Sequence, residues 1–371
     1  MPAIQKVDVY KIPMAGPADV SGLVQLIDEG TLDPGSIIAI LGKTEGNGCV
    51  NDFTREYATA ALAGCLGQRL GLAAAEVERR IAFVMSGGTE GVLSPHITVF
   101  ARCNTDETAG TQKRLAIGIA HTPEFLPEAL GRRVQIEETA KAVTAAMADA
   151  GIEQAADVHF VQIKCPLLTA ERVRAAHARK QTVVTEDAYA SMGYSRGASA
   201  LGVALALGEL SEIPAATAVL SDWSAFSTVA STSAGIELMC NVVILMGNAL
   251  RSASRYTIGH AVMKDAIDLN AIIAAFRHAG LGTYSADTLA ARARLVNVFA
   301  KAEAAPSGEV RGARHTMLDD SDINATRHAR AAVGGLIAGF AGTGLVYVSG
   351  GAEHQGPPGG GPIAVIAHAE D

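Results

Sequence analysis

The chain has 371 residues, of which 49% are hydrophobic and only 5% aromatic, and its formal net charge is −8. This length allows two or three domains with sizeable cores, and the negative charge argues against nucleic acid or an acidic membrane as the main partner. The sequence has neither a signal-like N-terminus nor an uncharged stretch of about 18 residues, and its five cysteines lack zinc-binding spacing, so we expect a cytoplasmic protein with reduced thiols.

The first predicted strand–helix–strand segment presents a lysine, an arginine and a serine in that order. The apolar run SIIAILGKTEG predicts a strand that ends near Lys43. The next run, NDFTREYATAALAGCLG, has Asp and Thr as N-cap candidates, then Arg55, then an Ala-rich remainder typical of a helix. The run IAFVMSGG predicts a strand that delivers Ser86 to a glycine turn.

The second segment repeats this order. The predicted strand VHFVQIKCPLL carries Lys164, and YSRGASALGVALALGEL places Arg196 at a helix entrance. The strand-like run STVASTSAGIELMCNVVILM delivers Ser231, which we align with Ser86 without a gap. Ser233 lies close by, but this alignment favours Ser231.

The third segment keeps the order once more. The predicted strand LVNVFAKAEA carries Lys301, the helical run NATRHARAAVGGLIAGF carries Arg327, and LVYVSGG delivers Ser349. A fixed order with variable gaps is the pattern of a repeated unit whose loops have changed length.

The repetition predicts the fold class. We expect three similar α/β repeat domains at residues 1–103, 111–248 and 254–371. They should lie in a pseudo-threefold arrangement, with sheets inside and helices outside, around one central active site.

The nine repeated residues indicate a single site with a definite chemistry. Taken one by one, they are more simply interpreted as solvated strand ends, surface charges and turns. Together, the serine turns offer backbone N–H groups to a carbonyl oxygen or oxyanion. A desolvated lysine among other cations has a lowered pKa, and in its neutral form it can accept the proton of a serine hydroxyl. The pattern favours nucleophilic attack on a carbonyl flanked by nitrogen in a small anionic substrate.

Two long motifs carry a resemblance to a known family. VMSGGTEGVLSPHITVFAR and VSGGAEHQGPPGGGPIAVIA resemble the signatures of the cyanuric acid hydrolase/barbiturase family, and the similarity extends over essentially the whole chain. The resemblance implies a cyclic amidohydrolase that opens a ring amide or imide without a catalytic metal. It also implies a homotetramer that binds a small cyclic imide, with no nucleic-acid or membrane partner.

The resemblance assigns roles to residues. It implies Ser231 as the nucleophile and Lys164 as its base, in the middle unit, with Lys43 and Lys301 as supporting positive charges. The implied substrate contacts come from all three units and are Arg55, Ser86, Gly87, Arg196, Thr232, Arg327, Ser349 and Gly350.

The resemblance also implies a structural cation beside the third unit. Its implied ligands are one carboxylate and several loop oxygens, from Glu303, Ala352, Gln355, Gly356, Pro357 and Gly360. Hard oxygen ligands of this kind suit Mg²⁺ or Ca²⁺. Without the resemblance, the Gly/Pro-rich loop would be interpreted as an ordinary solvent-exposed loop.

The leading functional hypothesis is hydrolysis of cyanuric acid to carboxybiuret, which then loses CO₂ to give biuret. Barbiturase, which opens barbituric acid to ureidomalonate, is an alternative that shares the nine residues. A non-enzymatic metabolite-binding or assembly protein with the same threefold shell is another. Cys165 is a rival nucleophile beside Lys164, but successive strand residues face opposite ways, so Cys165 should point away from the site.

Overall fold

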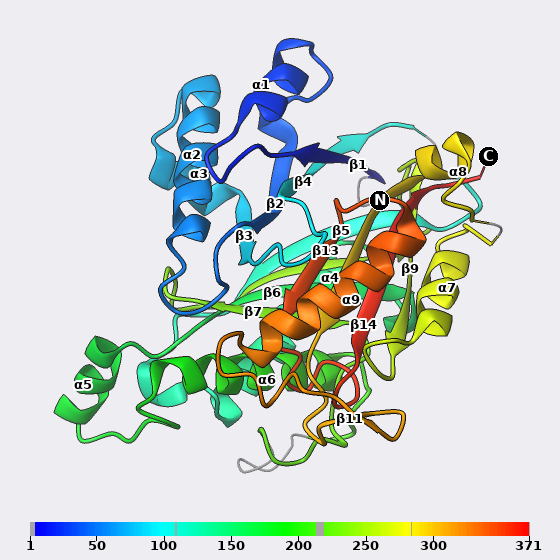
Figure 1. Ribbon diagram of the computed structural model, residues 1–371. Coiled ribbons are helices and arrows are strands. Elements are labelled where there is room, and N and C mark those ends of the chain that lie inside the picture. Colours follow the sequence, from blue (N-terminus) through cyan, green and yellow to red (C-terminus); the bar gives the residue numbers. More distant parts are fainter. Residues whose placement is uncertain (1–3, 108–109, 213–218, 283, 371) are drawn as a thin grey trace.

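Three four-stranded sheets form the centre of the molecule, and each sheet comes from one continuous stretch of chain (Figure 1). The computed structural model describes residues 4–107, 110–212, 219–282 and 284–370. We call the stretches that carry the three sheets units A, B and C. Their strands are β1 (Ile4–Pro13), β2 (Ile37–Thr44), β3 (Ala82–Gly87) and β4 (His96–Thr105) in unit A; β5 (Arg114–His121), β6 (Val158–Pro166), β7 (Ala230–Gly235) and β8 (Val242–Ala249) in unit B; and β9 (Tyr256–Met263), β10 (Leu295–Ala302), β13 (Tyr347–Gly350) and β14 (Gly361–His368) in unit C.

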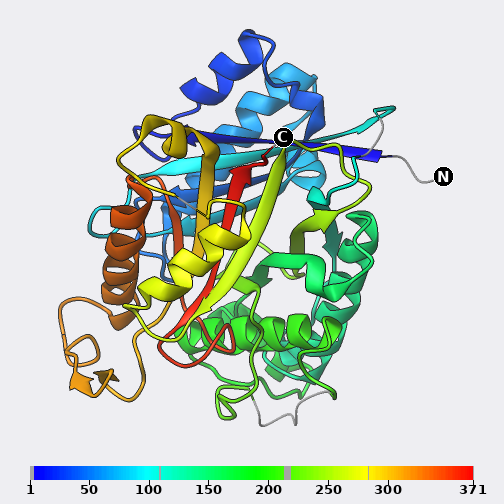
Figure 2. The ribbon, with the colours of Figure 1, turned by 90° about the vertical axis from the view of Figure 1, so that its right-hand side faces the viewer.

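Helices surround the three sheets, as the two perpendicular views show (Figures 1 and 2). They are α1 (Ser21–Asp28), α2 (Phe53–Leu70) and α3 (Ala74–Arg80) in unit A; α4 (Arg133–Asp149), α5 (Ala170–Ala178) and α6 (Ala188–Ala206) in unit B; and α7 (Leu269–His278), α8 (Leu289–Arg294) and α9 (Ala325–Ala341) in unit C. Short 3₁₀ turns occur at Pro34–Ser36, Pro127–Ala129 and Ala155–Asp157, and a two-stranded ribbon pairs β11 (Glu309–Val310) with β12 (Ala313–Arg314).

The three sheets share one strand order. In each, the first strand pairs with the last, the last pairs with the second, and the second pairs with the third. The second and third strands are parallel, while the other pairs are antiparallel. Parallel neighbours end at the same edge of a sheet, so this topology delivers the end of the lysine strand and the end of the serine strand to one place in every unit.

One face of each sheet looks toward the other two sheets. Apolar side chains from all three meet there in a buried cluster around Phe299, whose ring centroid lies 5.3 Å from that of Phe160 and 6.3 Å from that of Phe100. Side chains alternate along a strand, so residues two apart from these share the inner face. The inner face also carries Leu41, and two residues further along the same strand is Lys43.

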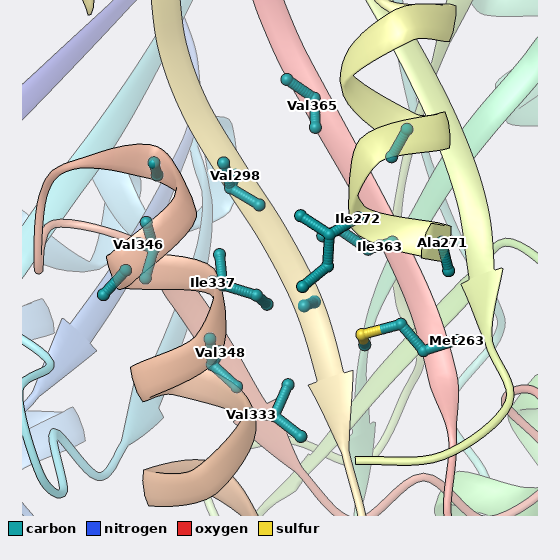
Figure 3. Packing of buried hydrophobic residues seen from close by; sticks show 14 of the residues in the cluster. Met263, Ala271, Ile272, Val298, Val333, Ile337, Val346, Val348, Ile363 and Val365 are labelled. Atoms are coloured by element: carbon teal, nitrogen blue, oxygen red, sulfur yellow. The ribbon is translucent and has the colours of Figure 1, made fainter. Parts of the chain in front are cut away.

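The opposite face of each sheet is covered by its own helices. In unit C, Val333 and Ile337 of α9 and Ile272 of α7 pack on Val298 and Ile363 of the sheet (Figure 3). Corresponding clusters join the first sheet to α1–α3 and the second to α4 and α6. The predicted α/β class, with sheets inside and helices outside, is confirmed.

The helix starts follow the sequence signals in two units and differ in one. The carboxylate of Asp52 caps α2 by accepting from the N–H of Thr54 at 3.0 Å, and Asn324 caps α9 in the same way. In unit B the capping residue is Asp187, so α6 begins at Ala188. Arg196 therefore lies in the middle of its helix, and its predicted place at a helix entrance is wrong. Among the described helices, none is long and apolar enough to cross a membrane.

Candidate active site

The strand register places a lysine opposite a serine in every unit. Lys43 pairs with Ser86 between β2 and β3, and Lys301 pairs with Ser349 between β10 and β13. Between β6 and β7, the partner of Lys164 is Ser233. All three lysines are 0% exposed, and by strand alternation each shares the inner face of its sheet with Leu41, Phe160 or Phe299.

The three serine hydroxyls meet at the centre of the molecule. Ser86 Oγ lies 3.2 Å from Ser349 Oγ, and Ser233 Oγ lies 3.3 Å from the same atom. Lysine ammonium groups surround them: Lys43 Nζ is 3.1 Å from Ser86 Oγ, and Lys301 Nζ is 3.3 Å from Ser349 Oγ. The predicted single site of near threefold symmetry is therefore present as a geometric arrangement.

The register corrects the alignment of the middle unit. Ser231 lies opposite Gln162, two residues deeper in the sheet, and its hydroxyl donates to Gln162 Oε1 at 2.9 Å. The small cavity at the centre is lined by Ser233 and Ala234 together with Ser86, Gly87, Ser349 and Gly350. The equivalence of Ser231 with Ser86 is wrong because the strand side-chain period of two gives both Ser231 and Ser233 the same facing, and only the register separates them.

Because Ser233 replaces Ser231 as the site serine, Thr232 no longer occupies the position of a substrate contact. Its side chain faces away from the serine cluster and donates to the carbonyl of Arg196, while its own carbonyl accepts from Lys301 Nζ at 2.8 Å. Ala234 occupies the position that Gly87 and Gly350 hold in the sister units. Cys165 lies in the cluster beneath α4 and α6, on the face of β6 opposite Lys164, as strand alternation predicted.

The three arginines at the cavity are Arg55, Arg196 and Arg330. Arg330 is 4% exposed, whereas the side chain of Arg327, one turn earlier on α9, is 40% exposed. Arg327 does not line the cavity; its Nε lies 3.2 Å from Glu90, the glutamate that also pairs with Arg330. The prediction of Arg327 as the third arginine is therefore wrong, and Arg330 takes its place. The two residues are three apart, so they lie on the same helix face and periodicity alone does not separate them.

Three glutamates complete the site, each four residues after a site serine. They are Glu90, Glu237 and Glu353, in the runs SGGTE, SAGIE and SGGAE. Sequence reasoning missed two of them, Glu90 and Glu353, and named Glu237 only as a candidate to orient a lysine or arginine. Glu90 accepts from Nε and Nη2 of Arg330 at 2.8 and 2.5 Å, and Glu353 accepts from Nε and Nη2 of Arg196 at the same distances. The shared Ser-(Gly/Ala)-Gly-x-Glu pattern was the signal that could have identified both these glutamates and Ser233.

Burial lowers the pKa of each site lysine. For Lys301, burial and then the Arg196 guanidinium lower the pKa to about 7, and for Lys43, burial and then Arg330 lower the pKa well below its usual value. Burial also lowers the pKa of Lys164, although Glu237 opposes the shift. Lysines with lowered pKa values beside hydroxyl groups can act as bases near neutral pH.

Tyr347 breaks the threefold pattern beneath the cavity. It stands two residues before Ser349, where the sister units have Val84 and Ser231. Its ring centroid lies 5.7 Å from Lys43 Nζ, and its buried hydroxyl lies near Ser86 and Ser233 without a well-formed hydrogen bond among the described residues. Burial raises the pKa of Tyr347. The region beneath the cavity is therefore aromatic on one side only.

Three of the predicted cation ligands, Glu303, Ala352 and Gly356, line one cavity beside unit C, whereas the side-chain oxygen of Gln355 accepts from the N–H of Thr232 at 2.7 Å. Glu303 accepts from the N–H of Ala304 at 3.0 Å and from that of Ala352 at 3.3 Å. Burial and the nearby Glu353 raise the pKa of Glu303. In the part of the chain that the structure describes, no three His, Cys, Asp or Glu side chains gather in a metal-binding group, so a cation here would depend on Glu303 and loop oxygens.

The arrangement suits attack on a flat ring. Each unit contributes a serine hydroxyl and an arginine with planar N–H donors to the lining of one cavity, and a buried lysine stands opposite each serine in the strand register. A ring with several equivalent carbonyls could place one oxygen at each turn, and one serine would then suffice for attack.

Comparisons with known proteins agree with this geometry. The family model described as amidohydrolase ring-opening protein matches residues 8–368. Cyanuric acid amidohydrolases of Bradyrhizobium diazoefficiens and of Pseudomonas sp. strain ADP are 66% and 59% identical to this chain, and each alignment covers 98% of this chain and 99% of the relative.

Solved structures give the same result. A cyanuric acid hydrolase structure described as evolutionary innovation by structural concatenation has a TM-score of 0.94 at 58% identity, and one from A. caulinodans has 0.90 at 49%. Both matches cover 99% of this chain and 100% of the other. The resemblance inferred from the motifs is confirmed: the chain belongs to the ring-opening amidohydrolase family of the cyanuric acid hydrolases and is a hydrolase that acts on the C–N bonds of cyclic amides.

Proposed function

We propose that this protein hydrolyses cyanuric acid to carboxybiuret, which loses CO₂ to give biuret, by a serine–lysine mechanism. The observation that carries the proposal is the meeting of three equivalent serine turns, with three buried lysines and three arginines, around one central cavity. Cyanuric acid offers three equivalent carbonyls to such a site. The names of the relatives at 51–66% identity support the same substrate.

We assign the nucleophile to Ser233 and the base to Lys164. The family resemblance points to the middle unit, and the strand register supports Ser233 as the partner of Lys164. Ser233 Oγ attacks a ring carbonyl carbon while its proton passes to neutral Lys164 Nζ. The ring C–N bond breaks, the proton passes to the departing nitrogen, and water then hydrolyses the resulting acyl-serine ester.

The other two units supply binding and stabilisation in this proposal. The turns at Ser86–Gly87 and Ser349–Gly350 hold the two carbonyls that do not react. Lys43 and Lys301, with the arginines, attract the anionic ring and stabilise negative charge as it develops on an oxygen. Two further nucleophiles would add nothing, because a single attack opens the ring.

Turnover of cyanuric acid by the purified protein tests the proposal. We expect kcat/KM for cyanuric acid to exceed that for barbituric acid by at least about 10²-fold, because polar groups built to pair a substrate N–H reject an analogue that has CH₂ in its place. Substrate loss would be followed by ultraviolet absorbance for both compounds side by side. A preference for barbituric acid would make this a barbiturase, and activity on neither would favour a binding protein.

We further propose that Glu303 and the loop 352–360 hold Mg²⁺ or Ca²⁺ in a structural role. The chemistry of the donors fits such an ion, because Glu303 is a half-buried carboxylate that accepts from backbone N–H groups and lies beside a second carboxylate, Glu353. A divalent ion would offset this concentration of negative charge and would accept backbone carbonyl oxygens as ligands.

Removal of divalent ions is expected to destabilise the protein through this site. Dialysis against a chelator should lower the melting temperature by several degrees, and added Mg²⁺ or Ca²⁺ should restore it, because an ion bound only by the folded state stabilises that state. Glu303→Ala should remove the response, while Glu309→Ala, at an exposed carboxylate of the same unit, should keep it. If neither the chelator nor added metal changes the melting temperature of the wild type, the proposed cation site is wrong.

A further inference from the structure

The glutamates that follow the site serines do not all make the same contact. In units A and C the glutamate forms an ion pair with an arginine of a neighbouring unit's helix, as Glu90 does with Arg330 and Glu353 with Arg196. The threefold counterpart of these arginines beside unit B is Arg55. Glu237 instead pairs with Lys164 of its own unit, with Oε1 2.8 Å from Nζ.

This exchange leaves Arg55 without the carboxylate contact that its counterparts have. Its Nη1 donates to the carbonyl of Ala234 at 3.1 Å, and its Nη2 donates to that of Cys49 at 2.9 Å. Its Nε is buried and has no hydrogen-bond partner among the described residues. The guanidinium of Arg55 is 4% exposed and lines the cavity, so part of its donor capacity faces the place where an anionic ring would bind.

The same exchange makes Lys164 unlike the other two lysines. Lys43 and Lys301 each contact the hydroxyl of their own serine, whereas Lys164 contacts the carbonyl of Met85 at 3.1 Å and the carboxylate of Glu237. Lys164 is therefore the site lysine whose ammonium form has a carboxylate in direct contact. A general base is protonated during the reaction. The contact with Glu237 stabilises Lys164 in that protonated state.

We propose that Glu237 is a positioning residue that orients Lys164 and stabilises its protonated form, and thereby makes unit B the reactive unit. The inference rests on the proposed function, in which Lys164 takes the proton of Ser233. Glu237 holds the ammonium by charge and hydrogen bond until the proton moves to the departing ring nitrogen. Glu90 and Glu353 pair with arginines instead, so they act on Lys43 and Lys301 only from a distance and neither lysine forms an ion pair with them.

The charged and titratable groups around this pair are few. Lys164 faces Glu237 from the loop after β7 and Arg55 from α2, and Cys165 is its neighbour on β6. Arg172 of α5 faces Glu237 from outside. Although the side chain of Glu237 is 37% exposed, the protein packed around its carboxylate opposes ionisation. Lys164 and then Arg55 outweigh this effect and lower the pKa of Glu237 to about 2, so the carboxylate stays charged throughout the neutral range.

Glu237→Gln tests the role because it keeps the shape and removes the charge. We expect kcat for cyanuric acid to fall by about 10²-fold or more with a smaller change in KM. Loss of the carboxylate lowers the pKa of Lys164, so the limb on which kcat rises with pH should move to lower pH. Glu237→Asp keeps the charge and should keep the rising limb of the pH–kcat profile near its wild-type position. Ionisation of the substrate is the same for all variants, so it does not explain a difference between them.

A second measurement does not depend on turnover. In protein labelled with ¹³C at the lysine ε-carbons, the resonance that disappears in Lys164→Met should titrate at lower pH in Glu237→Gln than in the wild type. Glu90→Gln, which breaks an arginine pair, should leave that titration in place and raise KM. An unmoved Lys164 titration in Glu237→Gln would overturn the inference even if activity falls. An inactive wild type with a shifted Lys164 titration would instead count against the proposed function and leave the Glu237–Lys164 coupling supported.

Discussion

Ser233→Ala is expected to abolish turnover, with kcat lower by about 10⁴-fold or more, while substrate still binds. The hydroxyl of Ser233 is the one in unit B that lines the cavity, and it lies 3.3 Å from the hydroxyl of Ser349. Without it no acyl-serine forms, and the lysines and arginines that hold the ring remain in place. The measurement is kcat from steady-state hydrolysis, together with binding of cyanuric acid by calorimetry.

Ser231→Ala is the matched control because it removes the same hydroxyl two residues away. Ser231 donates to Gln162 below the cavity and does not line it, so this variant should keep kcat within about tenfold of wild type and lose some stability from the broken buried hydrogen bond. Ser86→Ala and Ser349→Ala should lower kcat by about 10²–10³-fold through lost oxyanion and positioning contacts. A dead Ser86→Ala beside an active Ser233→Ala would move the nucleophile to unit A, where Lys43 already contacts Ser86.

The fold could be predicted from sequence because its signals are repeated and local. The apolar run before Lys43, the N-cap at Asp52 and the strand before Ser86 recur in order in each unit, and each signal depends only on neighbouring residues. Three agreeing copies made the α/β class and the central meeting of Lys43, Lys164 and Lys301 predictable. The common strand order of the three sheets needed pairing information that no single segment contains.

The errors at the site have one physical origin. Ser231 and Ser233 face the same side of a strand, and Arg327 and Arg330 face the same side of a helix, so periodicity cannot choose within either pair. The choice depends on strand register and on how far the helix extends toward the cavity. Both are set by packing between distant segments, as the pairing of Lys164 with Ser233 shows.

The glutamates illustrate a different limit. The spacing of Glu90, Glu237 and Glu353 from their serines is visible in the sequence. Their partners are not, because Arg330 and Arg196 come from helices of neighbouring units. Glu237 pairs with Lys164 and not with an arginine, and only the three-dimensional contacts show this difference. It nevertheless distinguishes unit B, to which we assign the nucleophile and the base.

Lys164→Met is expected to remove turnover as completely as Ser233→Ala, by about 10³-fold or more in kcat, because the serine proton loses its acceptor. Higher pH should not restore activity, since no other lysine is the register partner of this serine. Lys43→Met and Lys301→Met should raise KM and lower kcat by less than Lys164→Met does, because these residues contribute charge to binding of the anionic ring and to stabilisation of the developing oxyanion.

The same substitution should leave the protein at least as stable as the wild type. Lys164 is 0% exposed and burial lowers its pKa, so at neutral pH its ammonium form is less favourable in the folded state than in the unfolded chain. Methionine of similar length removes that buried charge, and the partner Glu237, whose side chain is 37% exposed, can be solvated by water. Urea denaturation at neutral pH would measure the difference in the free energy of unfolding. An inactive variant with an equal or higher unfolding free energy would mean that Lys164 is kept for chemistry. A large loss of stability together with the loss of activity would instead mean that its ion pair with Glu237 is structural, and the assignment of the base would fall to Lys43 or Lys301.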